Sequence, residues 1–122
     1  MANATSLVTF SSSTQGQAIK VAAVATPGTA VHATTTSATT IDRVWLYAFN
    51  SDTVDRVLTV EFGGPAAPDQ NIVVTVPFKQ GWILVSPGLP LLGNGSTALT
   101  VKAFASVANV VTVSGYVLRV VP

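Results

Sequence analysis

The chain has 122 residues, enough for one domain with a single hydrophobic core. Only 9% of the residues are charged, against roughly 25% in typical domains, and the formal net charge is +1, which argues against nucleic acid or an anionic membrane as a partner. Cysteine is absent, so disulfides, thiolate catalysis and cysteine-based metal sites are excluded. A monomer of this size usually carries more charge, and the low value favours a surface that neighbouring subunits cover.

The N-terminus, MANATSLVTF, has neither a basic region nor a long apolar core, so we expect no secretory signal. No window approaches the roughly 18 continuous apolar residues that a membrane helix requires. Residues 1–17 are expected to form an N-terminal arm or edge segment, and residues 18–122 a single β-sandwich domain.

Val and Thr are abundant, no long segment has helical spacing of apolar residues, and short apolar runs alternate with turn residues. This pattern predicts an all-β antiparallel sandwich of roughly eight to ten strands. In chain order, the expected strands are Leu7–Phe10, Gln17–Ala25, Ala30–Thr34, Ile41–Asn50, Arg56–Phe62, Asn71–Pro77, Trp82–Ser86, Leu89–Leu92, Ala98–Ala105 and Val111–Val121. Asn94-Gly95 predicts a tight hairpin that joins the strands around Leu92 and Leu99.

Alternation predicts which strands have a face toward water. In Arg56–Phe62, the pattern places Leu58 on the buried face and Glu61 on a polar face, where we expect Glu61 to be solvated.

The strand that begins at Val44 is apolar on both faces, with Trp45, Tyr47 and Phe49 on one of them. Two explanations remain open. Either the sandwich covers both faces, through the opposing sheet and a loop such as Ser11–Gln17, or the aromatic face meets another subunit.

Candidate catalytic residues are few. His32 is the single histidine, and nothing in the sequence pairs it with a nucleophile or an orienting group, so a structural role is expected. Asp52 and Asp55 could place oxygen ligands near a hard cation, but turn capping fits their spacing better. Asp42 and Asp69 lie apart from them in the sequence, and Glu61 has no second acid placed opposite it for hydrolysis.

Phosphate loops and carbohydrate sites are two further site types that glycine-rich turns and aromatic residues can form. Gly63-Gly64-Pro65 and Gly93-Asn94-Gly95 lack the lysine and the helix that follow a phosphate loop. Trp45, Tyr47 and Trp82 could form a carbohydrate site on a sheet face, although aromatic residues in a β domain usually belong to the core. We therefore expect no enzymatic activity, cofactor or metal.

A family resemblance appears once the motifs are taken in order. It rests on Val31-His32, the stretch IDRVWLYAFN from Ile41, LTVEFGG from Leu58, Asp69, Ile72–Pro77, Gly81, VSPG from Val85, Leu91-Leu92-Gly93, VKAFA from Val101, Ala108-Asn109-Val110 and GYVLRV from Gly115. In this order the chain, from about Val31 onward, resembles small structural proteins of tailed-bacteriophage virions, of the head decoration (cement) type.

The resemblance implies a jelly-roll-like sandwich that binds the outer surface of an icosahedral capsid, often as a homotrimer. Its partners would be further copies of itself and the major capsid protein. It would be synthesised in the bacterial cytoplasm and would then be located on the capsid surface of the virion. We expect Trp45, Tyr47 and Phe49 to form the contact between subunits. The segment Ala2–Gln17 is expected to reach a neighbour, and its candidate capsid contacts are Thr5, Ser6, Leu7, Ser11 and Ser12. The alternative is a module of a tail or fibre that binds a host glycan or receptor.

Overall fold

The structure, a computed structural model, describes residues 4–64 and 66–122, and assigns nine strands among them and no helix. Sheet A has the order β1-β9-β4-β7, and the short strand β2 also pairs with β9. Its strands are β1 (Ala4–Val8), β2 (Ile19–Lys20), β4 (Ile41–Asn50), β7 (Ile83–Leu91) and β9 (Val111–Val121). Sheet B has the order β3-β8-β5-β6, with β3 (Thr29–Ala33), β5 (Arg56–Phe62), β6 (Asn71–Val76) and β8 (Thr100–Ala105).

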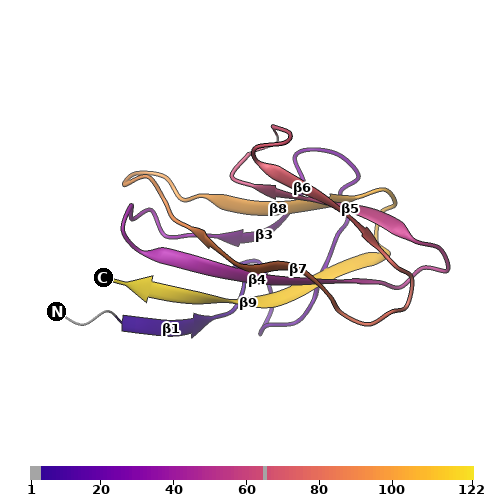
Figure 1. Ribbon diagram of the computed structural model, residues 1–122, viewed down its shortest axis with the longest axis horizontal. Coiled ribbons are helices and arrows are strands. Elements are labelled where there is room, and N and C mark those ends of the chain that lie inside the picture. The colour runs from indigo at the N-terminus through magenta and orange to yellow at the C-terminus, as the bar shows by residue number, and fades with distance from the viewer. Residues whose placement is uncertain (1–3, 65) are drawn as a thin grey trace.

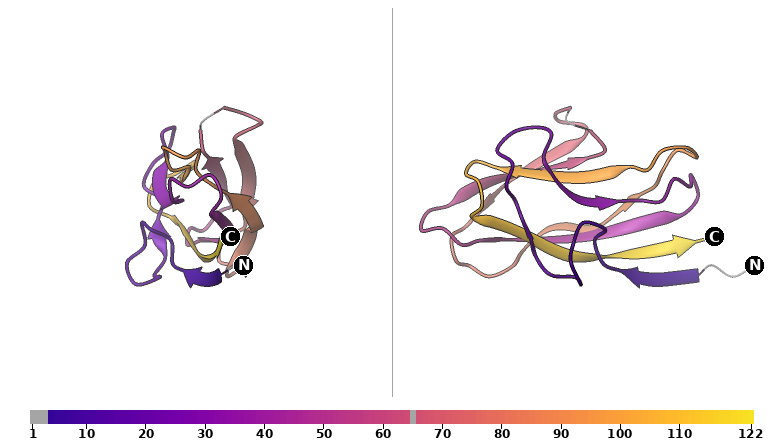
Figure 2. Two further views of the ribbon diagram at one scale, coloured as in Figure 1. Left: turned by 90° about the vertical axis from the view of Figure 1, so that its left-hand side faces the viewer. Right: turned by 180° about the vertical axis from the view of Figure 1, so that it is seen from behind.

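The two sheets lie face to face, and all strand pairs within them are antiparallel. Figure 1 shows sheet B as the upper layer and sheet A as the lower layer. Figure 2 shows the same layers from one end and from behind, where the chain between β2 and β3 crosses from the lower layer to the upper one. The expected all-β antiparallel sandwich is confirmed.

The core between the sheets consists mostly of valine, the residue type whose branched side chain packs well on a pleated surface. Its fully or almost fully buried apolar residues are Phe10, Val21, Val31, Val44, Leu46, Ala48, Leu58, Val60, Val76, Val101, Ala103, Ala105, Val111, Val113 and Val117. Strand β4 crosses the middle of sheet A, and the residues that face inward from it are fully buried.

Strand bounds agree with the sequence prediction at Ile41–Asn50, Arg56–Phe62 and Val111–Val121. Near the N-terminus they differ: the strand expected over Leu7–Phe10 is Ala4–Val8, and of the strand expected over Gln17–Ala25 only Ile19–Lys20 forms.

Strand β7 corrects a predicted turn. Trp82–Ser86 and Leu89–Leu92 were expected to be two strands separated by Pro87-Gly88, but Ile83–Leu91 is continuous and pairs with β4 along its length. Gly88 has a φ of 85°, a conformation open to glycine, and the register with β4 shifts on either side of Trp45 and Leu46. The Pro-Gly pair therefore marks an irregular edge strand instead of a chain reversal.

The hairpin expected at Asn94-Gly95 is also wrong. The turn itself forms, since the side-chain oxygen of Asn94 accepts hydrogen bonds from the N–H groups of Ser96 and Thr97, and Gly95 has a φ of 96°. However, β7 belongs to sheet A and β8 to sheet B, so the turn carries the chain between sheets.

Candidate functional site

The outward side of β4 carries Trp45, Tyr47 and Phe49. The residues that alternate with them are buried between the sheets, whereas these three lie on the outer face of sheet A and are half-buried. The opposing sheet therefore covers one face of β4 only. The outer face remains accessible in the single chain, as an interface would require.

The aromatic side chains on this face pack on one another. The rings of Trp45 and Tyr116 are stacked, with centroids 5.4 Å apart and planes 9° apart, and the guanidinium of Arg43 lies 5.4 Å from the Trp45 ring centroid. Phe49 meets Trp82 edge to face at 6.0 Å. These contacts fix the orientation of the rings, so the face is a defined surface.

Strand register places further apolar residues on this face, because residues directly opposite one another in an antiparallel pair share a side. Leu7 lies opposite Leu118, which lies opposite Arg43, and Leu84 lies opposite Tyr47. Leu7 is 70% exposed and Leu84 is 49% exposed. Arg43 is the one charged residue among these five.

A small hollow lies on the same face. Tyr47, Trp82, Ser114 and Gly115 line a space of about 180 Å³, and the Trp82 side chain at its edge is 50% exposed. An exposed indole beside a hydroxyl group is a pairing that sugars can use through stacking and hydrogen bonding.

Gly88 of the neighbouring edge strand sets the position of Trp45. A Cβ atom at Gly88 would lie 2.7 Å from the Trp45 ring, closer than side chains pack. The glycine thus leaves room for the indole.

The N-terminal segment proves to be part of the sandwich. Thr5, Ser6 and Leu7 belong to β1, which pairs with β9 at the edge of sheet A, and their side chains are exposed. Phe10, by contrast, is 1% exposed and lies in the core. Phe10 belongs to the segment expected to reach a neighbour, but it packs in the core of its own chain.

Two of the candidate capsid contacts are fixed to β3 by their own chain. Ser11 Oγ accepts a hydrogen bond from the Ala33 N–H (2.8 Å), and the Ser12 N–H donates one to the Val31 carbonyl (3.2 Å). These serines therefore hold the loop after β1 against the edge of sheet B.

His32 belongs to a buried polar cluster that the sequence did not reveal. Its Nε2 lies 2.8 Å from Asp42 Oδ2, and its Nδ1 accepts a hydrogen bond of 3.1 Å from the Ser11 N–H. Because Nδ1 is an acceptor here, the proton of the neutral ring belongs on Nε2, where it is donated to Asp42. Arg119 donates from Nε to Asp42 Oδ1 (2.7 Å) and from Nη2 to Oδ2 (2.9 Å).

The positive charge of Arg119 compensates the negative charge of Asp42 in this cluster. Burial alone raises the pKa of Asp42, but hydrogen bonds from Arg119 and His32, together with the positive charge of Arg119, outweigh it and hold the pKa below its ordinary value. The hydrogen bond to Asp42 likewise raises the pKa of Arg119. Asp42 therefore remains an anion although its side chain is fully buried.

The cluster ties the two sheets together and fits no hydrolytic arrangement. His32 is 2% exposed, and Ser11 approaches it with its backbone N–H instead of its hydroxyl group. A sign of the cluster was present in the sequence: Asp42 falls at an inward position of β4, and an acid there requires a buried partner. The sequence could not say that the partners are His32 and Arg119.

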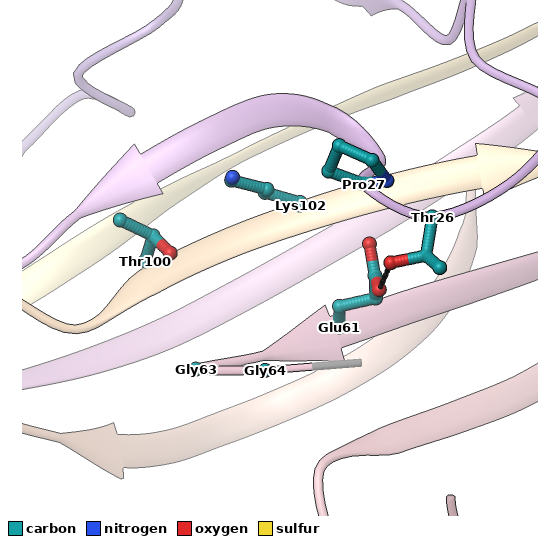
Figure 3. A pocket seen from close by; sticks show the side chains of 7 residues that line it. All are labelled: Thr26, Pro27, Glu61, Gly63, Gly64, Thr100 and Lys102. Atoms are coloured by element: carbon teal, nitrogen blue, oxygen red, sulfur yellow. Dashed lines mark hydrogen bonds between the residues drawn. The ribbon is translucent and has the colours of Figure 1, made fainter. Parts of the chain in front are cut away.

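Glu61 was expected to be solvated, and this is wrong, since it is 3% exposed. Thr26 Oγ1 donates to its Oε2 (2.6 Å) and the Gly28 N–H donates to its Oε1 (2.8 Å). The connection between β2 and β3 thus covers this part of the outer face of sheet B. Figure 3 shows Glu61 directed toward Thr26, with Lys102 extending away from both, in a hollow of about 460 Å³.

Of the two aspartates near β5, Asp52 bonds within its own turn, as expected, whereas Asp55 bonds to a distant segment. Asp52 accepts a hydrogen bond from the Thr53 N–H and pairs with Arg56, at 2.6 Å from its Nη2. Asp55 accepts a hydrogen bond from the Phe78 N–H. Within residues 4–64 and 66–122, no three His, Cys, Asp or Glu side chains gather as a metal site would require.

No protein family model, no curated protein and no solved structure matches this chain. In the described part of the chain there is no helix with the length and hydrophobicity to cross a membrane.

Proposed function

We propose that this chain is a non-enzymatic structural protein of a tailed-bacteriophage virion, which associates with copies of itself and decorates the outside of the capsid. The resemblance from about Val31 onward suggests the virion. One structural observation supports the mode of action: the outer face of sheet A presents ordered, half-buried aromatic rings beside exposed leucines.

The physical driving force for self-association is burial of this face. Apolar burial contributes roughly 25 cal/mol per Å², and a stable contact buries at least about 1,000 Å² in total. Trp45, Tyr47 and Phe49 form the centre of the proposed subunit contact, as aromatic residues do in many interfaces. A homotrimer built this way would place the remaining surface of each subunit toward the capsid protein.

Within the N-terminal segment, Thr5, Ser6 and Leu7 are the side chains we propose for the capsid contact. They are exposed on an edge strand, whereas Ser11 and Ser12 bond to β3. Their edge position would allow an extended segment of the capsid protein to lie beside them.

Light scattering across a concentration series tests the self-association. We expect the wild-type chain to be oligomeric and Tyr47→Glu to weaken the aromatic contact, since the variant places a charge at its centre. Val24→Glu is the matched control, because Val24 is 57% exposed and lies in the loop between β2 and β3, away from the aromatic face. Co-sedimentation with capsids of the phage that encodes the chain then tests decoration. A chain that remains monomeric at high concentration and does not bind capsids would refute the proposal.

The hollow beside Trp82 favours a second candidate function, namely glycan binding by a tail or fibre module. Trp82 is half-exposed beside Ser114, while one face of Trp45 already stacks on Tyr116. Tryptophan fluorescence, measured while each of a panel of host-surface glycans is added, distinguishes the glycan module from the decoration protein. Saturable quenching that Trp82→Ala abolishes would support the glycan module, and a decoration protein should show none.

A further inference from the structure

Five strands lie at the edges of the two sheets, because β1 and β2 each pair with β9 alone. Two of the five, β7 and β3, are protected against further pairing. Strand β7 contains Pro87 and Pro90, which cannot donate hydrogen bonds. Strand β3 is covered by the loop that Ser11 and Ser12 fix against it. Strands β1 and β2 have five and two residues, and the edge of β1 is the one proposed above for the capsid protein.

Strand β6 contains no proline, and no hydrogen bond of the described residues fixes a loop along its open edge. Its sequence from Asn71 to Val76, NIVVTV, contains neither proline nor a charged residue. Ile72 is 40% exposed and Val73 is 65% exposed. An uncharged, apolar edge strand of this kind is a template for pairing with another strand.

The hydrogen-bond pattern identifies the backbone groups that face outward. The Phe62 N–H donates to the Gln70 carbonyl at 2.6 Å, so these opposite residues form a hydrogen-bonded pair. Because such pairs alternate along an antiparallel ladder, Ile72 and Val74 also bond to β5. The N–H and C=O groups of Val73 and Thr75 therefore point toward the open edge.

Charges at the two ends of β6 indicate the partner. Asp69 precedes the strand and Lys79 follows it, and neither side chain has an ion-pair or hydrogen-bond partner in the described part of the chain. If β6 meets another β6 in antiparallel orientation, Asp69 of each copy approaches Lys79 of the other. A register that places Val73 opposite Thr75 brings the turn with Asp69, just before β6 of one copy, toward the segment with Lys79, just after β6 of the other.

We propose that β6 pairs with β6 of a second copy about a two-fold axis, so that the two four-stranded sheets B continue into one sheet of eight strands. Val73 and Thr75 of each copy supply the backbone hydrogen bonds. Asp69 and Lys79 supply complementary charges at both ends of the contact.

This contact is separate from the aromatic face on sheet A, so either contact can form without the other and each can be tested alone. If both occur, the β6 contact would join one oligomer of the proposed decoration protein to the next. The first test uses the Tyr47→Glu chain, in which the aromatic contact is weakened. Its mass by light scattering should then be twice the 12.5 kDa of one chain.

Two substitutions at the open edge should return this dimer to a monomer. Val73→Lys places a charge within the contact, and Thr75→Pro removes an N–H that the chain does not use for pairing with β5. Val24→Lys is the control, because Val24 is 57% exposed but lies in the loop between β2 and β3, away from β6. Far-UV circular dichroism establishes that each variant is folded. A Tyr47→Glu chain that is monomeric at every concentration, or an unchanged dimer in both edge variants, would overturn the proposal.

A charge exchange tests the orientation of the pairing. At low salt, Asp69→Lys or Lys79→Asp alone should weaken dimerisation, because each places like charges opposite one another. The double variant restores opposite charges and should recover the wild-type dissociation constant. Equal weakening in the double variant would refute antiparallel pairing of β6.

Discussion

The sandwich has two sides along which edge strands of both sheets run: β1 and β3 on one side, and β6 and β7 on the other. The strands on both sides have similar residues, but what lies between the two sheets differs. On the β1–β3 side, the chain after β1 passes from sheet A to sheet B, inserts Phe10 into the core and bonds to β3 through Ser11. The Phe10 ring also lies 5.9 Å from that of His32. This side is closed by the chain itself.

On the β6–β7 side, no described residue inserts between the two sheets as Phe10 does on the β1–β3 side. An open hollow of about 400 Å³ lies between the edges of the two sheets, and among its lining residues are Phe62, Ile72, Val85, Leu89 and Leu91. Leu89 is 38% exposed. The comparison shows that the chain closes one side with a core residue and a polar network, and leaves the other side available to a partner.

Loss of Phe10 should have the largest effect, because it removes the ring that fills the closed side. We expect Phe10→Ala to lower the free energy of unfolding by about 3–5 kcal/mol. Leu7→Ala, three residues earlier and 70% exposed, should change it by less than about 0.5 kcal/mol. Urea denaturation measures both. Equal effects would mean that the N-terminal segment does not close this side.

Loss of the Asp42 carboxylate should have the next largest effect, because Arg119 and His32 would lose their shared acceptor. We expect Asp42→Asn to lower the free energy of unfolding by about 2–3 kcal/mol at pH 7. Asp52→Asn, at an exposed ion pair, should cost much less.

The same carboxylate predicts a pH dependence. Its pKa is lower in the folded chain than in the unfolded chain, where it is about 3.9. The stabilisation is therefore present above about pH 4 and is lost as the pH falls through the lower folded value. Denaturant titrations between pH 7 and pH 2 should show a shallower acid decline for Asp42→Asn than for the wild type. Parallel curves would contradict this role for Asp42.

A substitution on the open side should have the smallest effect. We expect Leu89→Ala to lower the free energy of unfolding by less than about 1 kcal/mol, since Leu89 already contacts water. Leu58→Ala, at a fully buried residue, should lower it by about 2–5 kcal/mol. A large effect at Leu89 would mean that the hollow belongs to the core.

The sequence predicted the strands where local pattern decides the structure. Alternation placed Leu58 on the buried face of β5, and it separated Trp45, Tyr47 and Phe49 from the other face of β4, which the structure shows to be buried. Phe10 was missed as a core residue because it adjoins a Ser-rich loop, and its burial depends on a crossing between sheets.

Contacts between segments that are distant in the sequence account for the remaining differences between the predicted and the observed structure. Glu61 occupies the outer face that alternation assigned to it, but the sequence does not show that Thr26 and Gly28 cover it. His32, Asp42 and Arg119 come from three different strands, and only the sheet topology places them together.

The close approach of Gly88 to Trp45 also constrains how this surface can evolve. A larger side chain at position 88 would displace the indole and disturb its stacking on Tyr116, whereas a smaller residue at position 45 would remove this clash and leave the φ of 85° as the remaining reason for glycine. In a lineage of descendants, the two positions should therefore change together. A proline-glycine pair on an edge strand would then record, in the sequence alone, whether the aromatic face has been retained.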